Sequence, residues 1–263
     1  MLSRRCHAWP ELRASESLAT GKSSGASTRL RASVLLGVVL TGTSTLSQAG
    51  SAGGRWQVAG GSVATGTGSI AQSGAATTIQ QTSNKLVINW NSFNIGAGES
   101  VIFQQPSASA IALNRVTGAG TSQIDGALNA NGQVWVLNPN GVLFGHSAQV
   151  NMGGLVASTL RLSDSQFLAG NYQFSAEDGQ GVVRNQGRLN GGYVALLCSQ
   201  VSNSGSIHTP GGHTALGAGD AITLNFDGQH LLRLRVNAGA YQALVDNPAV
   251  LSFRRASAAG HGA

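Results

Sequence analysis

The amino-acid sequence predicts an all-β protein whose chain winds as a parallel β-helix. Three segments share one pattern. Each has a glycine two residues before an aliphatic residue, and then a second glycine that begins a run in which aliphatic residues or threonine recur at every second position. The segments are 126–136, 187–196 and 205–216. The last two copies begin 18 residues apart, and each follows an asparagine, Asn185 or Asn203. A short fixed period with one supersecondary unit per turn is typical of a solenoid. Helical periodicity is almost absent elsewhere, so the repeating unit is expected to consist of strands.

Composition supports a β architecture with many corners and a neutral polar surface. Glycine accounts for 37 of 263 residues, about twice its usual share. Charged residues make up 10% of the chain, far below the usual ~25%. Hydrophobic residues make up 41% and occur in regular short runs, which argues against disorder. A β-sandwich is the alternative fold, but it needs antiparallel hairpins with longer strands, and the sequence shows few of them.

Residues 1–49 are expected to be an extended secretory signal peptide. The first 33 residues carry six basic and two acidic side chains, and so contribute +4 of the net charge of +6. An apolar run follows at Ala32–Thr43, and Ser47-Gln48-Ala49 offers small residues to a signal peptidase, with cleavage after Ala49. A membrane anchor is disfavoured because about 12 apolar residues are fewer than the ~20 that span a bilayer. The nearly neutral remainder has no basic stripe, which argues against nucleic-acid binding.

Strand signals begin after the leader. Gly50–Gln81 is rich in small residues with scattered Val and Ile, so short, weak strands are expected there. Stronger signals follow, and in the first of them alternate residues place Leu, Ile and Trp on one face. These strands are Lys85–Trp90, Val101–Phe103 and Ile111–Leu113.

The best-marked corner of the chain is Asn138-Pro139-Asn140-Gly141. It separates two short β-branched or aromatic runs, Val134–Leu137 and Val142–Phe144. Pro139 has the φ of the second position of a type I turn, and Asn140 and Gly141 tolerate positive φ, so a tight turn is expected. Two interpretations of Asn138 and Asn140 are possible, and both can hold at once. Asn138 and Asn140 are corner residues that hydrogen-bond their own backbone, or they are recognition residues on an exposed, rigid corner.

Two isolated features interrupt the strand pattern. Ser163–Ala169 is the one candidate helix, with Ser163 as its N-cap and Gly170 as its stop. Cys198 stands alone once Cys6 leaves with the leader, so the exported chain is predicted to contain no internal disulfide. The thiol lies in an apolar run and is predicted to be a buried strand residue rather than a nucleophile.

The repeat pattern fails near the end of the chain. The domain is predicted to cover residues 50–247 and to be followed by an atypical tail at 248–263. Pro248 has no backbone N–H and cannot donate to a ladder, and residues from about Arg254 onward are expected to be disordered. The alternative is that Val250–Phe253 adds one more short strand as a cap.

Catalysis is disfavoured by the placement of the ionisable residues. A β-helical polysaccharide lyase, the enzyme alternative, needs clustered carboxylates for Ca²⁺ and a basic residue as the base. The eight carboxylates after the leader are scattered among turns and do not pair at the spacing of successive coils. The histidines show no metal-ligand spacing, so no metal and no cofactor are expected. Trp90 and Trp135 could stack on sugars, but both lie in strand runs where core packing is favoured.

An ordered set of five blocks resembles the secretion domain of two-partner-secretion exoproteins, the filamentous haemagglutinin family, and is most similar to its high-molecular-weight adhesin branch. The resemblance covers about residues 55–245. The Asn-Pro-Asn-Leu motif of the haemagglutinin branch has no match. The five blocks are 87–95, 101–106, 113–116, 138–142 and 153–160.

The resemblance implies a right-handed parallel β-helix with an N-terminal cap, and the scattered carboxylates predict that it is not an enzyme. It implies export to the periplasm of a Gram-negative bacterium, recognition by an outer-membrane β-barrel transporter through its periplasmic domains, and release to the cell surface or the medium as an adhesin. A host glycan or cell-surface receptor would be the eventual partner. The family's Asn-Pro-Asn-Gly recognition motif corresponds to Asn138, Pro139, Asn140 and Gly141. Because family members usually continue far beyond this length, a truncated or short member is expected.

Overall fold

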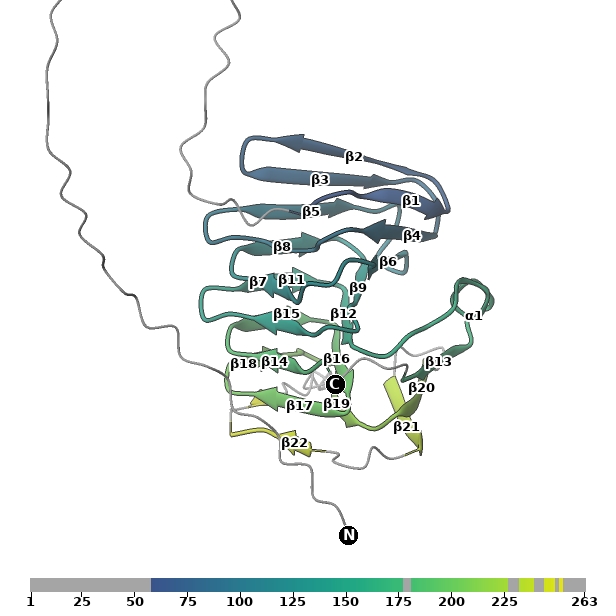
Figure 1. Cartoon of the computed structure of the whole chain (residues 1–263), viewed down its shortest axis with the longest axis vertical. Helices are drawn as coiled ribbons and strands as arrows, with labels where there is room; N and C mark the ends of the chain where they lie inside the picture. Colours follow the sequence, from purple (N-terminus) through teal and green to yellow (C-terminus); the bar gives the residue numbers. More distant parts are fainter. Residues whose placement is uncertain (1–57, 177–180, 227–231, 239–243, 249–250, 253–263) are drawn as a thin grey trace, which may run out of the picture. The chain divides into compact units, whose positions relative to one another are not determined.

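Strands of successive turns stack on one another in parallel and build the body of the protein (Figure 1). The computed structural model describes residues 58–176, 181–226, 232–238, 244–248 and 251–252, which contain 23 strands and one helix. The expected signal peptide at residues 1–49 lies outside the described residues. In the part of the chain that is described, no helix has the length and apolar character that crossing a membrane would require.

Each full turn of the solenoid contributes one strand to each of three sheets. The five-stranded sheet has the order β22-β17-β14-β10-β7, with β7 (Ser122–Ile124), β10 (Val142–Phe144), β14 (Val183–Asn185), β17 (Gln200–Asn203) and β22 (Leu244–Asp246). The eight-stranded sheet has the order β2-β3-β5-β8-β11-β15-β18-β23, with β2 (Gly68–Ser73), β3 (Ala76–Gln81), β5 (Ser100–Gln104), β8 (Ala127–Ala130), β11 (Gln149–Met152), β15 (Arg188–Gly191), β18 (Ser206–His208) and β23 (Leu251–Ser252). The seven-stranded sheet has the order β1-β4-β6-β9-β12-β16-β19, with β1 (Ser62–Thr65), β4 (Lys85–Trp90), β6 (Ile111–Val116), β9 (Gln133–Leu137), β12 (Gly154–Ser158), β16 (Tyr193–Cys198) and β19 (His213–Ala218).

The interior of the solenoid is a set of apolar columns that run across the strands. Because side chains alternate along a strand, an aliphatic residue that faces inward in one coil lies beside the inward residue of the next coil. One such column has every member at most 2% exposed, and burying each of these side chains contributes about 1.5–3 kcal/mol. Its members, in register, are Val101, Leu128, Val150, Leu189 and Ile207.

The N-terminal end of the solenoid is covered by antiparallel strands. β2 and β3 form an antiparallel hairpin, and β1 pairs antiparallel with β4, whereas the strands that follow in these two sheets pair in parallel. The cap protects the first parallel coil, whose backbone groups would otherwise form an open edge. The predicted fold, a parallel β-helix with an N-terminal cap, is confirmed.

The sequence repeats correspond to coils of the solenoid; the β11–β12 coil lies between the first and the second repeat, and the last two repeats are consecutive coils. The segments 126–136, 187–196 and 205–216 form the strand pairs β8–β9, β15–β16 and β18–β19. The two asparagines that precede the last repeats are buried and form a ladder. Asn185 Nδ2 donates to Asn203 Oδ1 at 2.7 Å, and Asn203 Nδ2 donates to Asn247 Oδ1 at 2.8 Å. The ladder satisfies polar groups inside the corner of three successive coils.

A second layer covers the outer face of the seven-stranded sheet. It consists of the helix α1 (Asp164–Ala169) and a three-stranded antiparallel sheet with β13 (Tyr172–Ser175), β20 (Ala221–Phe226) and β21 (Leu232–Ala238) (Figure 1). Trp135 is at the centre of the core between the two layers, with the Tyr172 ring 4.7 Å and the Phe226 ring 6.2 Å from its own. Trp90, in contrast, packs inside the solenoid. Both tryptophans are therefore core residues, as predicted, but in different cores.

The predicted helix is present with the predicted caps. The Gln166 N–H donates to Ser163 Oγ at 3.3 Å, and Gly170 ends the helix with a φ of +80°.

Cys198 is fully buried on β16, and its thiol donates to the Gln200 carbonyl at 2.7 Å. Burial raises the pKa of this thiol, and a neutral, inaccessible thiol is a poor nucleophile.

Near the end of the chain the structure has a short closing strand, β23, which agrees with the alternative given for Val250–Phe253. β23 lies inside the segment that was expected to be an atypical tail, and it pairs in parallel with β18. Strand pairing therefore continues past residue 247, because the backbone of any non-proline residue can extend a ladder even where the repeat pattern has ended. Arg254 and the residues after it lie outside the described residues, so their disorder stays a prediction.

Candidate functional site

The Asn138–Gly141 corner connects β9 of the seven-stranded sheet to β10 of the five-stranded sheet. The N–H of Gly141 donates to the Asn138 carbonyl at 3.0 Å, which closes a β-turn. The N–H of Asn140 donates to the Asn138 side-chain oxygen at 2.9 Å. The Asn138 side chain thus repeats the shape of a backbone turn, as asparagine commonly does at the start of a turn.

Asn138 joins three successive coils and has no exposed surface. Its Nδ2 donates to the Gly120 carbonyl at 2.9 Å and to Ser122 Oγ at 3.0 Å, both in the preceding coil. Its backbone N–H donates to the Ser158 carbonyl of the following coil at 2.9 Å. Asn138 is therefore a buried residue and not part of the exposed surface of the corner. Its side-chain amide points into the protein and donates hydrogen bonds to two groups of the preceding coil.

Asn140 and Pro139 are the parts of the motif that solvent reaches, Asn140 being exposed and Pro139 half-buried. Asn140 Nδ2 donates to the Gly118 carbonyl at 2.9 Å, and the Thr121 hydroxyl donates to the Asn140 carbonyl at 3.1 Å. Among the described residues, the Asn140 side-chain oxygen has no hydrogen-bond partner. The corner thus presents an unpaired acceptor on an anchored backbone.

Gly141 has a backbone conformation that other residues rarely adopt. Its φ is +119°, and a Cβ at this position would lie 3.1 Å from the Val182 carbonyl oxygen of the next coil. The N–H of Val142 donates to that same carbonyl at 3.0 Å, so the neighbouring chain cannot move away without losing a ladder bond. The site requires glycine for both reasons.

A hollow of about 360 Å³ lies beside the corner. It is bounded by the end of β6, the loop that follows it, the motif and the chain that leads to the helix. Its lining residues are Arg115, Val116, Thr117, Gly118, Ala119, Pro139, Asn140 and Arg161.

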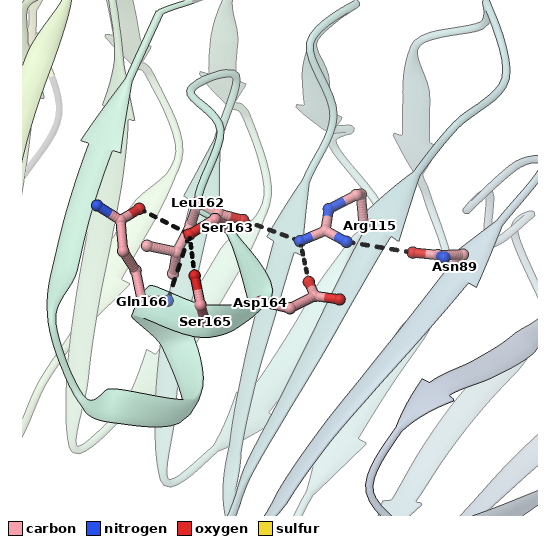
Figure 2. A network of polar contacts seen from close by, with 7 residues as sticks. All are labelled: Asn89, Arg115, Leu162, Ser163, Asp164, Ser165 and Gln166. Atoms are coloured by element: carbon pink, nitrogen blue, oxygen red, sulfur yellow. Dashed lines mark hydrogen bonds and ion pairs between the residues drawn. The ribbon is translucent and has the colours of Figure 1, made fainter.

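Arg115 connects the hollow to the start of α1 (Figure 2). Its guanidinium lies 2.6 Å from an Asp164 carboxylate oxygen, donates to the Leu162 carbonyl at 2.8 Å, and reaches Asn89 Oδ1 at 3.4 Å. The Arg115 and Asp164 side chains are 25% and 39% exposed, so water screens this ion pair only in part. Arg115 belongs to the 113–116 block that carries the family resemblance, but its partner 49 residues away could not be read from the sequence.

Lys85 holds the other end of the helix. Its ammonium donates to the Phe167 and Leu168 carbonyls, both at 2.8 Å, and lies 5.5 Å from the centres of the Phe167 and Tyr172 rings. The helix has no basic residue in its own last turn, so a lysine from β4 supplies the positive charge that a helix C-terminus favours. Burial lowers the pKa of this lysine. The helix beside the corner is thus fixed at both ends to the sheet beneath it.

Two of the described carboxylates are engaged in local structure. A Glu99 carboxylate oxygen accepts from the N–H of Gly96, and an Asp125 carboxylate oxygen accepts from the side-chain amide of Gln123, each at 2.8 Å. Across the described ranges, no three His, Cys, Asp or Glu side chains gather in a way that could hold a metal ion. Glu177, Asp178, Asp227, His230 and His261 lie outside the described residues.

Comparison with known proteins gives consistent matches. A family model described as "TPS secretion domain" matches residues 57–257. A heme/hemopexin-binding protein of Haemophilus influenzae (strain ATCC 51907 / DSM 11121 / KW20 / Rd) is 35% identical over 184 residues, which are 66% of this chain and 20% of that protein. A second Haemophilus influenzae protein of the same name is 46% identical over 98 residues, which are 37% of this chain and 11% of that protein. The chain thus spans about a fifth of the length of the first relative.

A solved structure has the same fold. The crystal structure of the HMW1 secretion domain from Haemophilus influenzae aligns with a TM-score of 0.68 and 32% sequence identity. The alignment covers 73% of this chain and 52% of that one.

Proposed function

This chain belongs to the TPS secretion domain family, and from that premise we propose that the Asn138–Gly141 corner is where an outer-membrane transporter recognises it. As a member of this family, the chain is a secretion-signal domain of a two-partner-secretion exoprotein. The observation that carries the proposal is that the two asparagines of the motif have different roles. Asn138 is buried and fixes the turn, while Asn140 presents an unpaired side-chain oxygen on the surface.

Rigidity supports a docking role for this corner. Hydrogen bonds join the motif to the preceding coil through Asn138 and Asn140, and to the following coil through the Pro139 carbonyl, which accepts from the N–H of Gly181 at 3.3 Å. A surface that is already ordered loses little conformational entropy when a partner binds. Recognition of a folded corner therefore costs less free energy than recognition of a mobile loop.

The partners of the whole exoprotein follow as further parts of the proposal. Residues 1–49 direct export to the periplasm, and the transporter is a β-barrel with periplasmic domains that contact residues 50–247. The exoprotein is released at the surface of a Gram-negative cell or into the medium as an adhesin, where a host glycan or cell-surface receptor is its partner.

A secretion assay with matched variants tests the recognition site. The full-length gene is expressed together with a gene for its outer-membrane transporter, and the protein is measured in the periplasm and in the medium after a pulse label. Asn140→Ala removes an exposed side chain and its bond to the Gly118 carbonyl, so we expect the free energy of unfolding to fall by less than about 1 kcal/mol while the protein accumulates in the periplasm. Asn225→Ala is the matched control, since Asn225 is an exposed asparagine on β20.

The two variants separate recognition from folding. Normal release of Asn140→Ala would contradict the proposal. Equal retention of Asn140→Ala and Asn225→Ala would also contradict it, because the effect would then not depend on the corner.

A further inference from the structure

The outward face of the eight-stranded sheet is rich in side-chain amides. From β3 to β18 its outward positions carry one guanidinium, Arg188, one imidazole, His208, and no carboxylate among the described residues. The amides lie on strands about 4.8 Å apart and, within a strand, about 7 Å apart, which makes a flat grid of polar groups. They are Gln80, Gln104, Asn129, Gln149, Asn151 and Asn190.

Gln80, Gln104 and Asn129 keep hydrogen-bonding groups free. Asn190 donates to Asn151 at 2.8 Å, and Asn151 donates to Asn129 at 3.2 Å, so the ladder ends with an unpaired Asn129 Nδ2. Gln80 and Gln104 lie opposite one another in register, both are exposed, and neither side chain has a hydrogen-bond partner in the described part of the chain.

The free amides surround a hollow of about 510 Å³. This volume is in the range of small-molecule sites. Ile102 and Ala130 contribute apolar surface to it, and Asn131 stands at its side. The Asn131 amide is held by the backbone N–H and carbonyl of Gln105, each at 2.7 Å, so this side of the hollow is already ordered before a ligand binds.

The side-chain amides of the hollow can hydrogen-bond a ligand that carries a row of hydroxyl groups. An amide side chain both donates and accepts hydrogen bonds, as a hydroxyl does, and the apolar patch suits the C–H face of a sugar ring. The absence of positive charge among the hollow's lining residues gives an acidic polymer nothing to pair with. We propose that this hollow binds a neutral oligosaccharide laid across β3, β5 and β8. The proposal goes beyond the secretion role and does not depend on it.

Titration of the full chain with neutral sugars tests the site. The side-chain amide signals are followed by nitrogen–proton NMR during addition of maltohexaose, laminarihexaose or, as the acidic arm, trigalacturonate. Because the hollow is open and the one aromatic ring among its lining residues, that of Phe103, is buried in the core, we expect affinity in the millimolar range. The largest shifts should occur at Gln80, Gln104 and Asn129 with at least one neutral hexasaccharide, and none with trigalacturonate.

A double variant and a matched control complete the test. Gln80→Ala/Gln104→Ala removes two exposed side chains that have no partner, so the fold should be unchanged, and affinity should fall at least about fivefold. Gln149→Ala alters an exposed glutamine of the same face outside the hollow and should leave affinity unchanged. Absence of shifts with both neutral sugars, undiminished binding by the double variant, or equal binding of trigalacturonate would overturn the proposal. Secretion of the double variant should be normal, which keeps this result separate from the transporter assay.

Discussion

Replacement of Asn138 by alanine should destabilise the whole solenoid, not only one turn. The change removes the side-chain bonds to Gly120 and Ser122 of the preceding coil, the bond from the N–H of Asn140 and a longer one, at 3.3 Å, from Asn140 Nδ2. Since Asn138 is fully buried, water cannot replace the lost partner without a rearrangement of the corner. Groups in two coils would therefore lose a hydrogen-bond partner at the same time.

The three shorter bonds, each 3.0 Å or less, set the expected magnitude. A net contribution of about 1 kcal/mol for each bond, and more for a buried group left unsatisfied, gives a loss of about 3 kcal/mol in the free energy of unfolding. For a domain of this size, such a loss corresponds to a fall in melting temperature of roughly 6–12 °C.

Thermal unfolding of Asn138→Ala and Asn140→Ala, followed by circular dichroism, checks this reasoning. Asn140 is exposed, so its variant should differ from the unchanged protein by less than about 1 kcal/mol. A melting temperature of Asn138→Ala within about 2 °C of the unchanged protein would refute the account of the corner. In the secretion assay the same variant should accumulate in the periplasm, because the turn that presents Asn140 is no longer fixed.

Four further predictions concern other parts of the chain. Gly141→Val should impair secretion and lower the melting temperature, because valine is strained at positive φ; normal release with unchanged protease resistance would contradict this. Lys85→Met should lower stability by about 1–2 kcal/mol by removing the charge from the helix C-terminus, as measured by denaturant unfolding, and an unchanged midpoint would show that the helix docks without it. The melting temperature should be the same with and without reductant, because Cys198 is a buried free thiol. Limited trypsin digestion should cleave at Arg254 or Arg255 while the body resists, and protection of both sites would indicate an ordered end.

Much of the fold could be predicted because its signals are local. Alternation of apolar residues marked β4 with its observed bounds, and the glycine-led repeats marked three of the coils. The caps of α1 were visible because a helix N-cap and a C-terminal glycine act within one turn. The turn at Asn138–Gly141 was visible because its residue types restrict the backbone at that point of the chain.

The tertiary structure alone decided which residues meet across coils. Pairing of the motif with Gly118 and Gly120 depends on the register between coils, and short-range patterns do not specify register across an irregular loop. The sequence marked Asn138 and Asn140 as equal candidates, whereas the structure buries one and exposes the other. It also places Lys85 at the end of a helix 82 residues later in the chain. The physical reason is that local conformation follows from neighbouring residues, while burial and partner choice follow from the way the whole chain stacks.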